Sequence, residues 1–389
     1  MLTKFVLSLM IVFAVGAHAQ SPVPPSVAKT FTPWFDHLPK EPRLRCSIEP
    51  LRPFLDFAFR FAAGYLVHCP LRQFGGEEDT LATFIRITPA GRPPLLLGDR
   101  SEVPAMPLSM GAKTSLSKSN VAIDYSGGFN LGEGRYRVTM LITDDRNHFC
   151  TKTWRIHASL TRSEKAAPLA ISPGEVKPLV LEPWEHPHPS RNGIRLTILL
   201  DAEPLRENSP ELQISGRLLL LESLSSLLRQ TPYGSVRLIT FNLDQARQLF
   251  EQDHFDRAGF ANLAQALSNL NLGTISYRAL ERQTWEHFLV HLVNGAMEAP
   301  DRPDAVVIMG PRTRLDARMP REMLEAPAGN GAQLFYFQYF PNWHRRAEFP
   351  DAITYLTKAR GGTIFKIHSP GELARAIRKF AEDLNRTRH

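Results

Sequence analysis

GIRLTILLDAEPL, residues 193–205, is the stretch of sequence that decides the fold. Its apolar run, Ile194–Leu200, lies between Asn192-Gly193 and Pro204, which is typical of a short buried strand. Asp201 stands where this strand is expected to end. In an open α/β sheet, the carboxyl ends of the strands border the crevice in which ligands bind. The stretch therefore predicts both an α/β unit and a candidate site at Asp201.

Strand and helix patterns alternate after Gly193. We expect strands at residues 236–241, 305–309, 334–340 and 363–367, with a short extended piece at 247–250. Helices are expected at residues 210–230, 257–270, 279–297, 351–360 and 371–384. Strands separated by helices form βαβ units, so the pattern predicts a doubly wound, mainly parallel sheet with helices on both faces.

The first half of the chain has a β pattern instead. Phe57, Phe59 and Phe61 alternate with smaller or polar residues, which predicts a strand with its aromatic rings on one buried face. Further strands are expected at residues 65–71, 82–88, 136–143 and 149–156, and the last two flank a four-residue turn. Several short strands at this spacing predict a β-sandwich of about a hundred residues.

The amino-terminal segment has the features of a secretory signal. Lys4 precedes an apolar stretch over residues 5–16, and Ala17-His18-Ala19 is a small-x-small cleavage signal. We expect residues 1–19 to be removed, with Gln20 as the first mature residue and the protein periplasmic or secreted. The rest of the sequence holds no apolar span long enough to cross a bilayer. The mature protein is therefore expected to have no integral membrane span.

Proline-rich stretches mark the expected domain boundaries. Residues 20–42 and 158–192 are predicted to be extended linkers. They leave a β-sandwich domain at 43–157 and an α/β domain at 193–389. A chain of 389 residues is too long for one ordinary core, in agreement with this division.

Charge and cysteine content narrow the classes of partner and chemistry. The formal charge is +7, but the basic residues are spread among 39 acidic ones, and export makes nucleic acid an unexpected partner. Cys46, Cys69 and Cys150 would meet an oxidising compartment, where one pair can bridge and one thiol remains. We favour a Cys69–Cys150 disulfide. The alternative is that all three are small buried residues.

The order of landmarks in the second half resembles a von Willebrand factor A (vWA) domain. The landmarks are LTILLD, VRLITFN followed by QARQLF, LNLGTISYRAL, AVVIM, QLFYFQYF and the closing GGTIFKI. The resemblance covers residues 193–389 and implies a vWA-like fold. In the first half, GEGRYRVTMLITDD loosely resembles the penultimate strand of immunoglobulin-like domains.

The vWA resemblance implies a divalent cation held by an Asp-x-Ser-x-Ser motif, a threonine and a second aspartate. Asp201 matches the first aspartate, but Glu203 and Leu205 replace the two serines. Thr274 falls where the threonine belongs, whereas Met309-Gly310-Pro311 stands where the second aspartate is expected. We therefore expect a degenerate metal site and no cofactor. A distorted site formed by Asp201, Glu203 and Thr274 is the weaker alternative.

Two loops expected at the same edge of the sheet are rich in basic residues. Arg312 and Arg314 follow one strand, and Trp343, His344 and Arg345 follow the next. Because arginine binds carboxylates bidentately, we hypothesise that these residues anchor an acidic group of a partner protein. Trp343 would supply an apolar anchor. The alternative is that they are ordinary solvated loop residues.

The sequence contains no GxSxG, HExxH, phosphate-binding glycine loop or GxGxxG motif. We therefore expect an exported, non-catalytic protein-binding protein, either an adhesion protein or a scaffold. One alternative is a hydrolase or metal-assisted enzyme that uses Asp201, Glu203 and either His254 or His344. Another is a small-ligand-binding periplasmic module that uses the same crevice.

Overall fold

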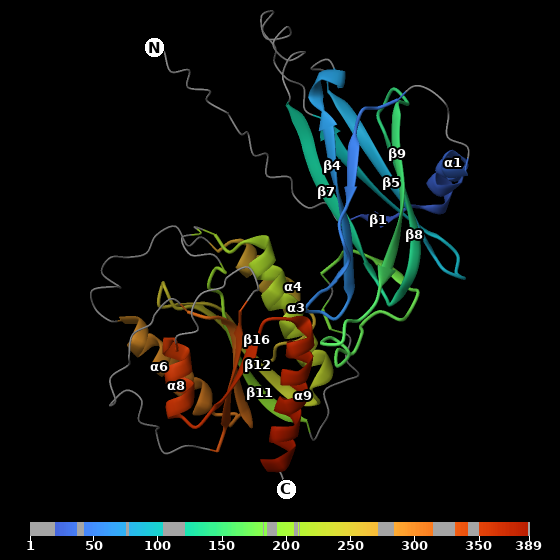
Figure 1. The fold of residues 1–389 in the computed structure, drawn as a ribbon. Coiled ribbons are helices and arrows are strands. Elements are labelled where there is room, and N and C mark those ends of the chain that lie inside the picture. Colours follow the sequence, from blue (N-terminus) through green and yellow to red (C-terminus); the bar gives the residue numbers. More distant parts are fainter. Residues whose placement is uncertain are drawn as a thin grey trace, which may run out of the picture. The chain divides into compact units, whose positions relative to one another are not determined.

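A computed structural model describes residues 20–36, 43–74, 78–103, 121–181, 183–184, 193–205, 209, 211–270, 284–313, 331–340 and 350–387. The chain divides into two compact units (Figure 1). The first comprises residues up to Phe54, Arg60–Ser159 and Ile171–Val180. The second comprises Leu55–Phe59, Leu160–Ala170 and Leu181–His389. The expected signal peptide, residues 1–19, lies outside the described residues.

The first unit contains two antiparallel sheets. One has the order β1 (Ser21–Pro22), β6 (Leu95–Val103), β5 (Asp79–Pro89), β8 (Gly134–Thr143) and β9 (Phe149–Ala158). The other has the order β10 (Val176–Pro178), β7 (Ala122–Leu131), β4 (Phe61–Pro70) and β2 (Ser47–Pro50), and β3 (Phe54–Leu55) also pairs with β4. A short 3-10 helix, η1 (Leu71–Phe74), follows β4. These sheets confirm the predicted β-sandwich.

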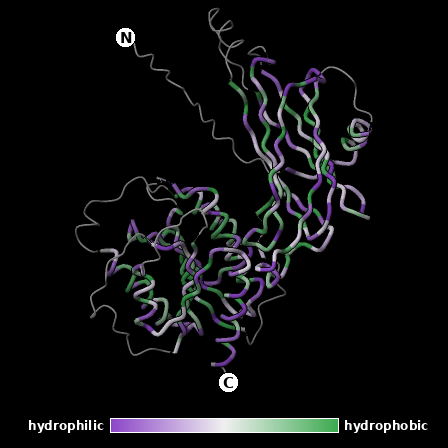
Figure 2. The backbone as a smooth tube through the Cα atoms, in the orientation of Figure 1, coloured by the Kyte–Doolittle hydropathy of each residue, from purple (hydrophilic) through white to green (hydrophobic). Residues whose placement is uncertain are grey.

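The alternation of side chains along the strands gives this unit its core. Phe61, Ala63, Tyr65, Val67 and Cys69 are buried along β4, whereas the residues between them are partly or fully exposed. The strands of this unit accordingly alternate between apolar and polar colours in Figure 2. This two-residue period is what a sheet with one buried face requires.

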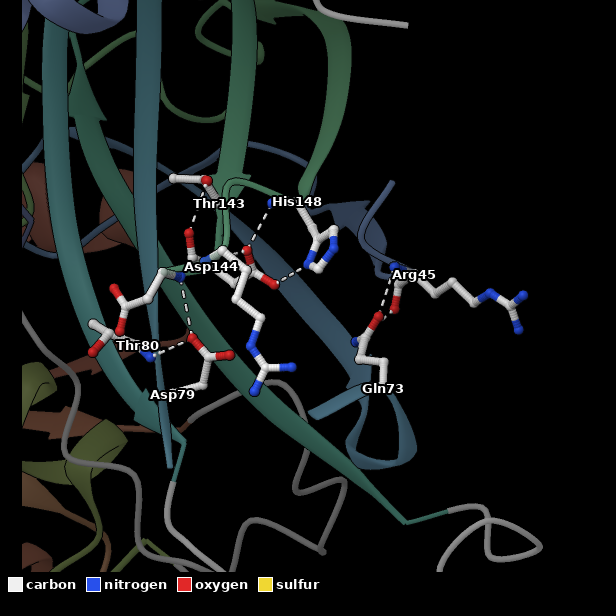
Figure 3. A network of polar contacts seen from close by, with 9 residues as sticks. Arg45, Gln73, Asp79, Thr80, Thr143, Asp144 and His148 are labelled. Carbon is white, nitrogen blue, oxygen red and sulfur yellow. Dashed lines mark hydrogen bonds and ion pairs between the residues drawn. The ribbon is translucent and has the colours of Figure 1, made fainter. Parts of the chain in front are cut away.

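The predicted β8–β9 hairpin is confirmed, and its turn is held by polar contacts (Figure 3). Asp144 accepts hydrogen bonds at Oδ1 from the backbone N–H groups of Arg146 (3.0 Å) and His148 (2.7 Å). The Oδ2 atom of Asp144 lies 2.6 Å from His148 Nδ1. Asp79 on β5 accepts from the Asp145 N–H (3.1 Å), which ties the turn to the neighbouring strand. Such local side-chain acceptors favour turns over continued strand.

Tyr136 at the start of β8 fixes the connection that precedes it. Its hydroxyl donates to the Gly132 carbonyl (2.7 Å) and lies 3.3 Å from the Glu175 carbonyl. A tyrosine that bonds back to the backbone a few residues upstream is a feature of immunoglobulin-like sandwiches. It occurs in the hairpin for which the sequence showed that resemblance.

The proline-rich amino-terminal segment differs from the expected extended linker. Residues 25–36 form the helix α1 (Pro25–Asp36), and β1 pairs with β6. The Phe31 ring stacks on Phe84 with centroids 4.0 Å apart, so α1 covers part of the outer face of the sheet. Arg86 joins this contact through an ion pair with Asp36 (2.8 Å). The apolar side chains of α1 therefore outweigh the preference of its prolines for extended backbone.

The predicted strand through Phe57, Phe59 and Phe61 is wrong before Phe61. Residues 56–60 form a tight turn, in which Asp56 Oδ1 accepts from the Ala58 N–H (3.0 Å) and Phe59 has a positive φ of 61°. A positive φ is uncommon for a bulky residue, and here Phe59 is fully buried. The two-residue spacing of Phe57, Phe59 and Phe61 therefore does not reflect one continuous strand.

The predicted Cys69–Cys150 disulfide is also wrong, because the structure joins Cys46 to Cys69. β2 runs antiparallel to β4 with Ser47 opposite His68, so Cys46 faces Cys69. Their Cα atoms are 4.4 Å apart, within the range that a disulfide requires. Cys150 lies on β9 in the other sheet and is a free thiol.

The second unit has a six-stranded sheet in the order β13 (Arg247–Gln252), β12 (Tyr233–Asn242), β11 (Ile194–Asp201), β14 (Ala305–Pro311), β15 (Gln333–Tyr339) and β16 (Thr363–Ile367). All neighbouring pairs are parallel except β12–β13. Counted along the chain, the order is 3-2-1-4-5-6, which is a common doubly wound arrangement. The predicted fold class is therefore confirmed.

Helices cover both faces of this sheet. They are α3 (Ile214–Gln230), α4 (Gly259–Ser268), α6 (Thr284–Met297), α8 (Ala352–Ala359) and α9 (Pro370–Thr387). Figure 1 shows α6 and α8 on one side of the sheet and α3, α4 and α9 on the other. The inner strands β11, β14 and β15 are almost continuously buried, as expected for parallel strands packed on both faces. No helix in the described part of the chain is long and apolar enough to span a membrane.

Two segments from the amino-terminal half complete the second unit. Residues 55–59 and 160–170, which we call the clasp, pack on α3 and α9. Ser226 Oγ donates to the Phe57 carbonyl (2.7 Å), and Arg229 donates to the Ala58 carbonyl (2.8 Å). On α9, Arg375 donates to the Ser163 carbonyl (2.8 Å). Part of the expected 158–192 linker therefore belongs to the packed unit.

Candidate functional site

The candidate site lies where the order of the sheet reverses. β11 has β12 on one side and β14 on the other, so the connections that leave β11 and β14 diverge at their carboxyl ends. Asp201 is the last residue of β11, beside the final residues of β14, Met309–Pro311. Such a switch point is where open α/β sheets bind ligands. The sequence-based placement of Asp201 at this edge is correct.

Asp201 is completely buried. Among the residues that the structure describes, neither of its carboxylate oxygens has a hydrogen-bond partner within normal distance. Burial raises the pKa of Asp201 well above its ordinary value, and the negative charges of Asp244 and Asp351 raise it further. The backbone N–H of Glu203 lowers the pKa in part, although it does not form a hydrogen bond of normal geometry with the carboxylate. Asp201 therefore holds its proton more tightly than an exposed aspartate does.

Other acidic groups gather around Asp201. Glu203, two residues further along, is also buried. The pKa of the buried Tyr336 is raised first by burial and then by the charges of Asp351, Asp201 and Glu203. The charges of all three acids thus act on Tyr336, a single residue of β15. This edge of the sheet therefore concentrates carboxyl groups in a water-poor environment.

Asp351 was not recognised as a site residue in the sequence, yet it organises this edge. Its Oδ1 accepts from the Thr354 N–H (2.7 Å) and so caps the first turn of α8. Its Oδ2 accepts from the backbone N–H of Thr313 (3.0 Å), Gln338 Nε2 (3.1 Å) and the Tyr336 hydroxyl (3.3 Å). The sequence signal was an aspartate as the first residue of a predicted helix, a position that indicates a helix cap rather than a site.

These contacts determine where the chain leaves β14. The Thr313 N–H is bound by Asp351, and the Pro311 carbonyl accepts from the Tyr336 hydroxyl (3.1 Å). Arg312 lies between these two anchored residues and is half-buried. Its backbone is therefore held on both sides, which limits the positions that its guanidinium can reach.

The remaining predicted site residues cannot be placed beside Asp201. Thr274, Arg314, Trp343, His344 and Arg345 all lie outside the described residues. His254 is described but is distant from Asp201. It precedes Phe255, whose N–H donates to the Val236 carbonyl (2.8 Å), five residues before the Phe241 that pairs with Asp201. Five residues of strand span roughly 16 Å.

The carboxylate oxygens at this edge are poor ligands for a divalent cation. A hard cation needs several ionised oxygen ligands, and a carboxyl with a raised pKa must first lose its proton to bind one. Asp201 has such a raised pKa, and the oxygens of Asp351 already accept four hydrogen bonds. Across the described ranges, no three His, Cys, Asp or Glu side chains gather in a way that could hold a metal ion.

No family model and no curated protein matches this sequence. The chain is similar in shape to the ArnB paralog VWA2 of Sulfolobus acidocaldarius, with a TM-score of 0.31 and 12% identity over 64% of this chain and 51% of that one. It is also similar to the putative ApaA protein of Bordetella pertussis, with a TM-score of 0.19 and 14% identity over 32% of this chain and 100% of that one. A β-glucuronidase of Bacteroides uniformis gives a TM-score of 0.21 and 10% identity over 76% of this chain and 36% of that one.

The chain spans about half the length of the Sulfolobus protein. A mixed, mainly parallel sheet in the order 3-2-1-4-5-6 with helices on both faces is consistent with a vWA-like α/β fold. The protein thus combines an antiparallel β-sandwich with a doubly wound, mainly parallel α/β unit.

Proposed function

We propose that this chain is an exported, non-catalytic scaffold or adhesion protein that binds another protein at the carboxyl edge of its α/β sheet. The observation that carries the proposal is the state of the acids at that edge. Asp201 is buried with a raised pKa, and Asp351 is occupied by four hydrogen bonds. These carboxyl groups maintain the shape of the edge and are poorly suited to cation binding, so recognition there is independent of a cation.

Arg312 is the described residue that we assign to partner recognition. It follows the central strand β14 at the switch point, and the hydrogen bonds of Tyr336 and Asp351 hold the backbone on both sides of it. An arginine whose backbone is fixed loses less entropy when it forms a bidentate pair with a carboxylate. The partner group is therefore an acidic side chain of another protein.

Export is part of the same proposal. The signal-like segment at residues 1–19 supports it, as does the Cys46–Cys69 disulfide. Disulfides persist in oxidising compartments and are rare in the cytosol.

The test is a pull-down from envelope extract with immobilised mature protein, residues 20–389, in the presence and absence of EDTA. We expect the same specific partners under both conditions. Arg312→Ala should reduce their recovery at least tenfold, whereas Arg312→Lys should reduce it less. Arg257→Ala is the matched control, because Arg257 is exposed just before α4, away from this edge.

Two results would overturn the proposal. One is partner binding that disappears with EDTA and returns with Mg²⁺. The other is a partner list that Arg312→Ala leaves unchanged.

A further inference from the structure

Three cysteine side chains come together at one end of the β-sandwich. Cys46 and Cys69 form the disulfide, and the free Cys150 thiol donates to the Cys46 carbonyl with Sγ 3.4 Å from the oxygen. The site therefore contains the Cys46–Cys69 disulfide and a third sulfur atom, Cys150 Sγ, that contacts Cys46. Nothing in the proposed binding function uses this arrangement.

The arrangement follows from the path of the chain before β2. Ser47 pairs with His68, which places Cys46 against Cys69 on β4. Just upstream, the Leu44 N–H donates to the Phe149 carbonyl (2.9 Å), so this segment also runs beside the start of β9. Cys46 consequently lies between a strand of each sheet.

We propose that Cys46, Cys69 and Cys150 form an internal thiol–disulfide exchange site. The Cys150 thiolate attacks Cys46 Sγ and forms a Cys46–Cys150 bond, while the Cys46–Cys69 bond breaks. Cys69 leaves as a thiolate and takes a proton from water, which replaces the proton that Cys150 released. The number of disulfides and of thiols is unchanged, so no oxidant or reductant is consumed.

The surroundings of Cys150 keep this exchange slow at neutral pH. Burial raises the pKa of the Cys150 thiol, while a backbone hydrogen bond from Cys46 to the sulfur and the nearby Lys152 ammonium lower it in part. Only the thiolate attacks a disulfide, so the exchange rate rises with pH. Cys69 is completely buried, which makes it a poor leaving thiolate until the site opens.

The exchange changes what the disulfide connects. The Cys46–Cys69 bond links two strands of one sheet across 23 residues of sequence. A Cys46–Cys150 bond would link the two sheets across 104 residues. A longer closed loop removes more conformational entropy from the unfolded chain. The rearranged form would therefore constrain the sandwich more strongly, with Cys69 as the buried free thiol.

The test maps the disulfides of the mature protein, purified without reductant. Samples incubated at pH 6 and pH 9 are quenched with acid, alkylated and digested with trypsin, which separates the three cysteines onto different peptides. We expect a Cys46–Cys150 peptide, together with alkylated Cys69, that is at least fivefold more abundant at pH 9. Cys150→Ser should abolish both signals and keep Cys46–Cys69.

A second variant tests whether the geometry permits the new bond. Cys69→Ser, refolded in a glutathione redox buffer, should form Cys46–Cys150 in monomeric protein. Absence of the Cys46–Cys150 peptide from the wild type at pH 9 overturns the exchange, whatever the variant does. Two free thiols or intermolecular dimers in Cys69→Ser, with no internal bond, overturn it as well.

Discussion

Gly310 on β14 lies directly against Asp201 at the end of β11. A Cβ atom at position 310 would come within 2.5 Å of the Asp201 Cβ and 3.1 Å of its backbone oxygen, distances at which something must move. The glycine therefore allows the two central strands to approach each other at the point where the candidate site begins. The close contact also helps to exclude water from the Asp201 carboxyl group.

We predict that Gly310→Ala destabilises the protein by about 1–3 kcal/mol, the usual cost of overpacking a tight interior. Urea unfolding of the variant measures this change. Gly295→Ala is the matched control, because Gly295 lies within α6 and, apart from the adjoining helix backbone, no heavy atom of the described residues lies within 4 Å of a Cβ built there. An alanine within a helix should be neutral or stabilise by up to about 1 kcal/mol. Equal effects of the two substitutions would contradict the close contact.

The second prediction concerns the pH dependence of stability. Because the pKa of Asp201 is raised above its ordinary value of 3.8, the folded protein keeps a proton that the unfolded chain releases. The stabilisation linked to this proton is fully present below pH 3.8 and is lost as pH rises toward the folded pKa. The side chain introduced by Asp201→Asn cannot ionise, so the variant does not lose this stabilisation as pH rises.

The unfolding free energy of Asp201→Asn relative to the wild type should therefore increase with pH from about pH 4, by at most about 1.4 kcal/mol per pH unit. Urea unfolding at half-unit steps between pH 4 and pH 8 measures the difference. The lowest pH is the internal control, since asparagine resembles a protonated aspartate in shape. A difference that stays constant, or that shrinks as pH rises, would show that the pKa is not raised.

The clasp gives the third prediction. Ser226→Ala removes the hydroxyl that donates to the Phe57 carbonyl from a fully buried position on α3. A partly buried carbonyl that loses its donor costs up to about 1–3 kcal/mol. Ser268→Ala on α4 is the control, because that exposed hydroxyl only bonds back to the Ala264 carbonyl (2.8 Å). Its effect should stay within about 0.5 kcal/mol.

Limited proteolysis supplies an independent measurement for the clasp. Ser226→Ala should speed cleavage near residues 55–59, whereas Ser268→Ala should leave the rate of cleavage there unchanged. Identical digestion patterns for both variants and the wild type would mean that this hydrogen bond does not hold the clasp in place.

The periodicity of the sequence was sufficient to predict the α/β sheet. A parallel strand covered on both faces must be apolar almost throughout, as Ala305–Pro311 is. Amphipathic helices such as α9 must present apolar residues every three or four positions. Because each element of this unit needs its own pattern to be buried, the order of patterns was enough to give the order of strands and helices.

Contacts between distant segments could not be predicted in this way. Cys46 pairs with Cys69 because β2 lies beside β4, and strand pairing leaves no local mark on a sequence. Phe59 belongs to the second unit and is fully buried, in a turn with positive φ that the spacing of the phenylalanines did not indicate. Tertiary context decided both cases.

The candidate site was predictable only in part, for a related reason. Asp201 could be placed because it ends a recognisable strand. Asp351 is about 150 positions further along the sequence, and its role depends on β14 and β15 lying next to α8. In the sequence it appears only as a residue that begins a helix.

Asp351 provides the last prediction, because it connects the stability of the site to the proposed binding. Asp351→Asn keeps the shape of the side chain but replaces an acceptor oxygen with an amino group that must face at least one of four donors. We expect a loss of about 2–4 kcal/mol in urea unfolding, since a buried network loses both a charge and a bond. Asp256→Asn is the control, because Asp256 is exposed and accepts one bond, from the Gly259 N–H (2.9 Å), which should limit its cost to about 1 kcal/mol.

If Asp351 holds the Arg312 loop in place, Asp351→Asn should also weaken partner recovery in the envelope pull-down under conditions where the variant remains folded. If a destabilised Asp351→Asn protein still recovers its partners in full, the hydrogen bonds of Asp351 are not required for recognition by Arg312.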